Sequence, residues 1–141
     1  MPRESTESFL KAGAGLLSDL RRCLEIHRDE ILFAYLFGSF ARGDAGPRSD
    51  LDLAVYFVDR RPHVHHTLKI DLYMTINRLL KQNDVDIVVL NTASNLMLLD
   101  EILRQGIVLL DADPEFREEF ELKTLHLAMD FREQRKAIMG I

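Results

Sequence analysis

The chain has 141 residues, of which 47% are hydrophobic and 29% charged, and its formal net charge at pH 7 is −5. This length and composition predict one soluble domain over residues 1–141, and the acidic balance argues against a nonspecific nucleic-acid binder, which would carry a basic face. Cys23 is the single cysteine, no apolar run reaches membrane length, and the N-terminus lacks a signal-peptide pattern, so we expect a cytoplasmic protein without a membrane anchor.

The first predicted element is an amphipathic helix that begins near Phe9 and places Leu20, Cys23 and Leu24 on one apolar face. Cys23 is expected in the core on this face, because no neighbour that would activate its thiol is evident. The next predicted element is a strand over residues 31–37, an apolar run that has strand length and strand composition.

This strand ends abruptly in Gly38-Ser39, and ten residues later Asp50-Leu51-Asp52 opens a second predicted strand that runs to about Val58. Alternation along a strand puts Asp50 and Asp52 on one face, where two repelling carboxylates usually bring a cation, above all Mg²⁺. A glycine lets the backbone approach a ligand closely, and a short helix beginning at Ser39 would point N–H groups at an anion. The pattern predicts a triphosphate at the turn and a metal ion on the aspartates. The alternative is a tight hairpin with two solvated aspartates.

The segment between the two strands carries Arg42 and Arg48, and an arginine beside a triphosphate can neutralise its charge. We favour a role for Arg42 in substrate binding or motif packing, whereas Arg48 is equally well interpreted as a solvated loop charge. Three histidines follow, and they offer no tetrahedral metal set, so we expect them at the solvated start of a helix that runs from about residue 64 to 81. They are His63, His65 and His66.

A third strand is predicted from Asn83 to Leu90, and it begins with two aspartates that share a face, Asp84 and Asp86. The next helix is predicted to start with Ser94 as its N-cap and to stop at Gly106. A short fourth strand follows over residues 107–110.

The last predicted helix begins at Asp113-Pro114, which combines an N-cap residue with a proline in the first turn, and runs to about Met139. At 100° per residue its apolar residues fall on two nearly opposite sides, so one side can face the domain and the other a partner. The alternative is a helix sunk in a groove of its own domain. We expect the smaller set to face outward: Leu122, Leu125 and Met129. The larger set is Phe116, Phe120, Leu127, Phe131 and Ile138.

The full string around the turn carries a family resemblance. Gly38-Ser39-Phe40-Ala41-Arg42-Gly43, followed by Ser49-Asp50-Leu51-Asp52-Leu53, resembles the signature of the DNA polymerase β-like nucleotidyltransferase superfamily. It is most similar to the minimal nucleotidyltransferases, which act as antitoxins beside HEPN-domain toxins. The resemblance implies an α/β (α+β) fold with a small mixed sheet of about four strands flanked by helices.

The same resemblance implies a third acidic residue on a strand beside the aspartate pair. Asp86 fits that place, and Asp84 is the fallback. The implied metal ligands and catalytic residues are then Asp50, Asp52 and Asp86, which would hold two Mg²⁺ or Mn²⁺ ions, with Asp86 at the acceptor side as second-metal ligand or general base. The implied nucleotide-binding residues are Gly38, Ser39, Arg42 and Arg48.

The resemblance further implies that ATP is the donor and that AMP is transferred to a hydroxyl group, typically of a tyrosine, on a HEPN ribonuclease toxin, which is thereby neutralised. A second copy of the chain is a further candidate partner. Two alternatives remain open: a small-molecule nucleotidyltransferase of the antibiotic-modifying kind, and a non-catalytic antitoxin that neutralises its toxin by contact alone. The complete set of acidic residues argues against the last of these. The sequence has no Walker A and no G-x-G-x-x-G motif, which disfavours a P-loop enzyme.

Overall fold

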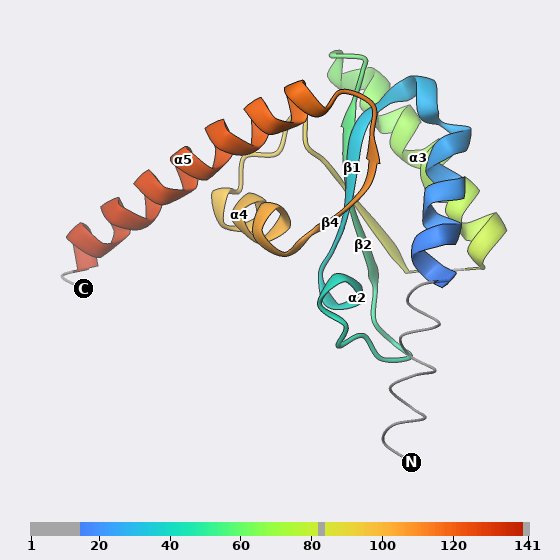
Figure 1. Ribbon diagram of the computed structural model, residues 1–141, viewed down its shortest axis with the longest axis horizontal. Coiled ribbons are helices and arrows are strands. Elements are labelled where there is room, and N and C mark those ends of the chain that lie inside the picture. The colour runs from blue at the N-terminus through green and yellow to red at the C-terminus, as the bar shows by residue number, and fades with distance from the viewer. Residues whose placement is uncertain (1–14, 82–83, 140–141) are drawn as a thin grey trace.

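The computed structural model describes residues 15–81 and 84–139, and at its centre is a mixed four-stranded sheet in the order β3-β2-β1-β4 (Figure 1). β1 is antiparallel to both β2 and β4, whereas β2 and β3 run parallel. The predicted small mixed sheet is therefore confirmed. The strands are β1 (Ile31–Phe37), β2 (Leu51–Phe57), β3 (Val85–Val89) and β4 (Ile107–Asp111).

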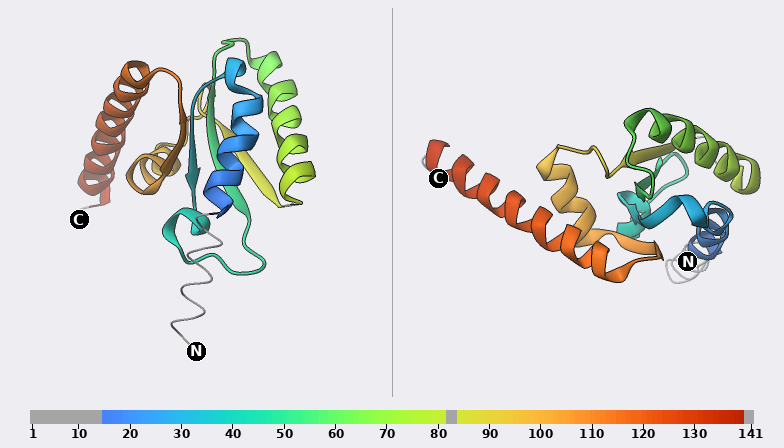
Figure 2. Two further views of the ribbon diagram at one scale, coloured as in Figure 1. Left: turned by 45° about the vertical axis from the view of Figure 1, so that its right-hand side comes forward. Right: turned by 90° about the horizontal axis from the view of Figure 1, so that it is seen from above.

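Helices cover both faces of the sheet (Figures 1 and 2). The N-terminal helix, described over residues 15–26, lies with α3 on one face, and α4 and α5 lie on the other. The labelled helices are α2 (Ser39–Arg42), α3 (Pro62–Leu80), α4 (Leu96–Gln105) and α5 (Pro114–Met139), and a 3₁₀ turn, η1 (Arg28–Glu30), precedes β1. The predicted beginning of the N-terminal helix near Phe9, and Asn83 at the predicted start of the third strand, lie outside the described residues.

No helix in the described ranges is both long enough and apolar enough to cross a membrane.

Strand β2, one of the two inner strands, is buried on both sides, which explains its nearly continuous apolar sequence. Its residues Leu51, Leu53, Val55 and Phe57 are buried in the core beneath the N-terminal helix and α3. This core also holds Cys23 with no exposed surface, as predicted. Ala54 packs in the second core, beneath α4 and α5. Because side chains alternate along a strand, Asp52, two positions before Ala54, faces the α4 side of the sheet.

An aromatic cluster fixes the first half of α5 against the sheet. Phe33 and Tyr56 meet Phe116 and Phe120 with ring centroids 5.2 to 6.2 Å apart, in tilted and edge-to-face arrangements. The second half of α5 extends beyond the sheet (Figure 1), and residues 132–139 are all exposed. The predicted long last helix is confirmed, and it begins with the Asp113 side chain accepting a hydrogen bond from the Phe116 N–H (3.1 Å).

The predicted division of the apolar residues of α5 is only partly right. Leu122 and Met129 are 60% and 53% exposed, as expected of an outward-facing set, but Leu125 is half-buried. Leu127 and Ile138, predicted to face the domain, are 49% and 85% exposed. The physical reason is that the sheet and α4 contact a narrower strip of α5 than the apolar periodicity suggests, with Thr124 and Ala128 at its buried centre.

Two local predictions are also corrected. The N-cap of α4 is Asn95 and not Ser94, since the Asn95 side chain accepts a hydrogen bond from the Leu98 N–H (3.2 Å). His65 lies in the first turn of α3 but is 3% exposed and not solvated, because its ring stacks on Phe57 at 5.6 Å and its Nε2 bonds the Asp59 carbonyl. His63 and His66 are exposed, as predicted.

Candidate active site

The turn between β1 and α2 forms one wall of the site. Gly38 has φ +74° and ψ −155°, a conformation that side-chain-bearing residues rarely adopt, and α2 begins at Ser39 as predicted. The Gly38 carbonyl accepts the N–H groups of Ala41 and Arg42 (3.1 Å each), which closes the first turn of this helix. A Cβ atom on Gly38 would overlap Asp52 Oδ2. The turn at Gly38 can therefore contact Asp52 in β2 directly, because glycine has no side chain to fill the space between them.

The strand register brings two of the predicted carboxylates side by side. Asp52 in β2 is the parallel-strand partner of Asp86 in β3, so both side chains lie on the same face, toward α4. Asp50 immediately precedes β2, and Asp84 immediately precedes β3, where its carbonyl accepts the Leu51 N–H (2.8 Å). Of the two candidates for the third acidic position, Asp86 is the one paired with Asp52 within the sheet.

The electrostatics of the site centre on Asp52, which is half-buried. Burial raises the pKa of the Asp52 carboxyl above its ordinary value, and the negative charges of Asp86, Asp50 and Glu101 raise it further. The charge of Arg42 lowers it, but this attraction does not reverse the shift. Three neighbouring carboxylates are thus close enough to disfavour the ionised form of Asp52.

Glu101 is the member of the site that the sequence did not predict. It lies on α4, and its Oε1 accepts a hydrogen bond from Arg42 Nη1 (3.0 Å), while Arg42 Nε donates to Asp44 (3.4 Å). Arg42 is therefore held beside the carboxylates by acidic partners on both sides. Arg48 is exposed on the loop between α2 and β2.

Among residues 15–81 and 84–139, no three His, Cys, Asp or Glu side chains converge closely enough to hold a metal ion. The chemistry of the donor set nevertheless fits a hard divalent cation, because Asp50, Asp52 and Asp86 supply only carboxylate oxygens. Burial and the neighbouring negative charges raise the pKa of Asp52, and a bound cation would favour its ionised form.

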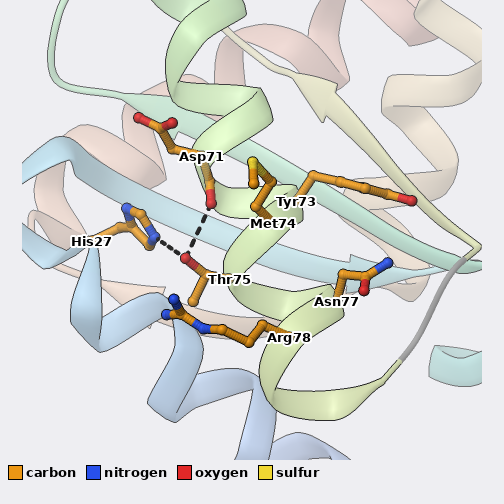
Figure 3. Close-up of a pocket in the computed structure, with 7 residues that line it drawn as sticks. All are labelled: His27, Asp71, Tyr73, Met74, Thr75, Asn77 and Arg78. Carbon is orange, nitrogen blue, oxygen red and sulfur yellow. Dashed lines mark hydrogen bonds between the residues drawn. The ribbon is translucent and has the colours of Figure 1, made fainter.

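A hollow of about 490 Å³ lies elsewhere, between the end of the N-terminal helix and α3 (Figure 3). The Thr75 hydroxyl donates to the Asp71 carbonyl (3.0 Å), so its oxygen accepts from His27 Nε2 (2.8 Å). These bonds tie the two helices together. Thr75 lies on α3, which covers the face of the sheet away from Asp52, so we assign this hollow no part in the chemistry.

The family profile described as polymerase beta, nucleotidyltransferase, matches residues 20–115, a range that contains the turn, all the carboxylates and Glu101. The chain belongs to the polymerase beta nucleotidyltransferase family. As a member of this family it is a nucleotidyltransferase, with the mixed sheet and flanking helices of that fold, as the signature around Gly38-Ser39 and Asp50-Leu51-Asp52 implied.

Solved nucleotidyltransferases of toxin–antitoxin systems have the same fold. A chain in a crystal structure of a toxin–antitoxin with AMP-PNP has a TM-score of 0.70 and 27% identity over 88% of this chain and 95% of that chain. A chain of an MntA–HpeT toxin–antitoxin mutant with two aspartates changed to glutamate also has a TM-score of 0.70, at 25% identity over 88% of this chain and 95% of that chain.

A third match is a chain of a tri-AMPylated HEPN toxin in complex with an MNT antitoxin from Shewanella oneidensis. It has a TM-score of 0.64 and 26% identity over 86% of this chain and 93% of that chain. The predicted resemblance to minimal nucleotidyltransferases is thereby confirmed. No curated protein matches the chain in sequence.

Proposed function

We propose that this chain is the antitoxin of a toxin–antitoxin pair and transfers AMP from ATP to a hydroxyl group of a HEPN toxin, with tyrosine as the acceptor that the family resemblance implies. The observation that carries the proposal is the similarity over nearly the whole chain to nucleotidyltransferases in such complexes, one with AMP-PNP and one with an AMPylated toxin. The carboxylate cluster beside the Gly38-Ser39 turn supplies the chemistry that such a transfer needs.

In the proposed reaction the Gly38-Ser39 turn binds the triphosphate, because a glycine lets the backbone approach a ligand closely and Gly38 lies directly beside Asp52. Asp50 and Asp52 would hold a divalent cation, which would supply neutralisation of phosphate charge and a lower pKa of the acceptor hydroxyl. Arg42 positions the nucleotide, and its contacts with Asp44 and Glu101 keep its guanidinium at the site before substrate arrives. Arg48 is a further candidate contact of the phosphates, from the neighbouring loop.

Asp86 is assigned to the acceptor side of the site. Its side chain is exposed, whereas that of Asp52 is half-buried, so an acceptor approaching from solvent reaches Asp86 first. The acceptor oxygen attacks the α-phosphorus and gives its proton to the Asp86 carboxylate as the bond to pyrophosphate breaks. The new bond is a phosphodiester between the acceptor oxygen and AMP, and pyrophosphate leaves.

Asp86→Asn should lower the rate of AMP transfer by about 10²–10⁴-fold, the usual contribution of a positioned general base. Asp84→Asn is the matched control, because Asp84 lies two residues before Asp86, just outside β3, and its backbone contact to Leu51 does not depend on its side chain. We expect its transfer rate to stay within a few-fold of the wild-type rate in single-turnover kinetics. The reverse order of effects would show that Asp84 occupies the third acidic position.

Chelation should stop nucleotide transfer, and added Mg²⁺ or Mn²⁺ should restore it. The reason is that the site holds repelling carboxylates where it must also accept a polyphosphate of the same charge. Pyrophosphate release from ATP in the presence of the toxin, measured with and without chelator, checks this. Undiminished release in excess chelator would rule out the metal assignment of Asp50 and Asp52.

A further inference from the structure

One long side of α5 lies beside the strip that packs on the domain, whose buried centre is Thr124 and Ala128, and it touches α4 only at its edge, where Arg132 contacts Asp100 (3.4 Å). Positions separated alternately by four and three residues form a single stripe along a helix. On this side of α5 such a stripe has apolar residues at its centre, with Leu122 60% and Met129 53% exposed. We call these six residues the α5 stripe: Glu118, Leu122, Leu125, Met129, Arg132 and Lys136.

The charges of α5 are divided between its two ends. Residues 114–122 contain four glutamates and one arginine, whereas residues 132–139 contain three basic residues and one glutamate. The α5 stripe shows the same division, with Glu118 at one end and Lys136 at the other. The contact of Lys136 with Glu133 (3.8 Å) is exposed and weak, and Glu118 forms no ion pair within the described part of the chain.

We propose that a second copy of this chain covers the α5 stripe, with the two α5 helices antiparallel. Aligning the helices about residue 127 places Glu118 opposite Lys136 of the second copy, and Leu125 opposite Met129 of the second copy. Leu122 then lies against the aliphatic part of Arg132, whose head group reaches Asp100 of its own chain (3.4 Å). A two-fold axis generates each contact twice.

The distribution of charge along the α5 stripe favours a second, antiparallel copy of the chain over other partners. A parallel pair would place Glu118 against Glu118 and Lys136 against Lys136, and a partner of uniform charge would be repelled by one end of the stripe. The second half of α5 extends beyond the sheet (Figure 2), so a second helix can lie along that half without meeting the strands. Since only three apolar side chains per copy are covered, we expect a dimer that dissociates on dilution.

The mass of the full chain in solution tests the proposal, measured by light scattering after size exclusion over a range of concentrations. We expect about twice 16.3 kDa at high concentration. Leu122→Gln with Met129→Gln should raise the dissociation constant at least about tenfold. Leu127→Gln with Ile138→Gln is the matched control, because both residues are exposed on α5 but lie off the stripe, and it should dimerise like the wild type.

Charge swaps test the antiparallel arrangement. Glu118→Lys and Lys136→Glu should each weaken the dimer, and the double variant should restore it. Mixing the two single variants should also restore association, since every opposed pair is then of opposite sign. A chain that stays at 16.3 kDa at all concentrations overturns the proposal, and so does a dimer that the two glutamine substitutions on the stripe leave intact. A monomeric chain that loses toxin binding on those substitutions would assign the stripe to the toxin instead.

Discussion

Asp52→Asn should abolish AMP transfer and at the same time raise the melting temperature of the protein. The loss of transfer is expected to be about 10²–10³-fold or more, the scale on which a positioned electrostatic group acts in an active site. The gain in stability is expected because burial and the charges of Asp86, Asp50 and Glu101 disfavour the ionised carboxylate at position 52 in the folded chain. An asparagine keeps the shape and removes the charge.

The pH dependence separates this explanation from a general packing effect. Because folding raises the pKa of Asp52, the carboxyl destabilises the wild-type fold as pH rises through the folded-state pKa. Below its unfolded value of 3.8 the group is protonated in both states. The stability difference between Asp52→Asn and wild type should therefore be present at neutral pH and vanish in acid, as measured by denaturant unfolding. A variant less stable than wild type at neutral pH would contradict this assignment.

Gly38→Ala should both destabilise the fold and disable the site. The backbone conformation of Gly38, with φ +74°, costs a residue with a side chain roughly 1–3 kcal/mol. In addition the new Cβ would overlap Asp52 Oδ2, so the carboxylate must move away from its position beside the turn. A misplacement of this kind should lower the transfer rate by about 10²-fold or more. Thermal unfolding and single-turnover transfer measure the two effects.

Gly43→Ala supplies the comparison, since Gly43 ends α2 with φ +82° but an added Cβ there has nothing within 4 Å. It should cost roughly 1–2 kcal/mol of stability for the left-handed backbone and leave transfer nearly unchanged below the melting temperature. If the two alanine variants lost the same fraction of activity, the close approach of Gly38 to Asp52 would have no functional part.

The strands and the site motif could be predicted because their signals are local. Glycine and serine after an apolar run, and aspartates at alternate positions, need no tertiary information to place Gly38, Asp50 and Asp52. The choice between Asp84 and Asp86 could not be settled from sequence, because the two share a face of the predicted strand, whose first residue the sequence does not fix. Pairing with Asp52 is a property of the parallel register, which only the folded sheet reveals.

The remaining differences between the sequence-based predictions and the structure arise from contacts between residues far apart in the chain. Glu101 reaches Arg42 across 59 residues of sequence, and nothing in the pattern of α4 marks it for the site. His65 is buried because the ring of Phe57 in β2 stacks on it in the first turn of α3. On α5, helical periodicity correctly placed Leu122 and Met129 outside, but it could not give the width of the contact surface that half-buries Leu125.

The most direct test of the proposed function is the intact mass of the proposed HEPN toxin partner, sought as the product of the neighbouring gene, after incubation with the protein and each Mg²⁺–nucleotide. We expect the toxin to gain one or more AMP units with ATP, on a hydroxyl-bearing residue located by peptide mapping, and its ribonuclease activity to fall in parallel. The Asp52→Asn variant should leave the toxin mass unchanged. An unmodified toxin that is still neutralised would contradict catalysis, and nucleotide transfer to a small-molecule hydroxyl in place of the toxin would contradict the proposed acceptor.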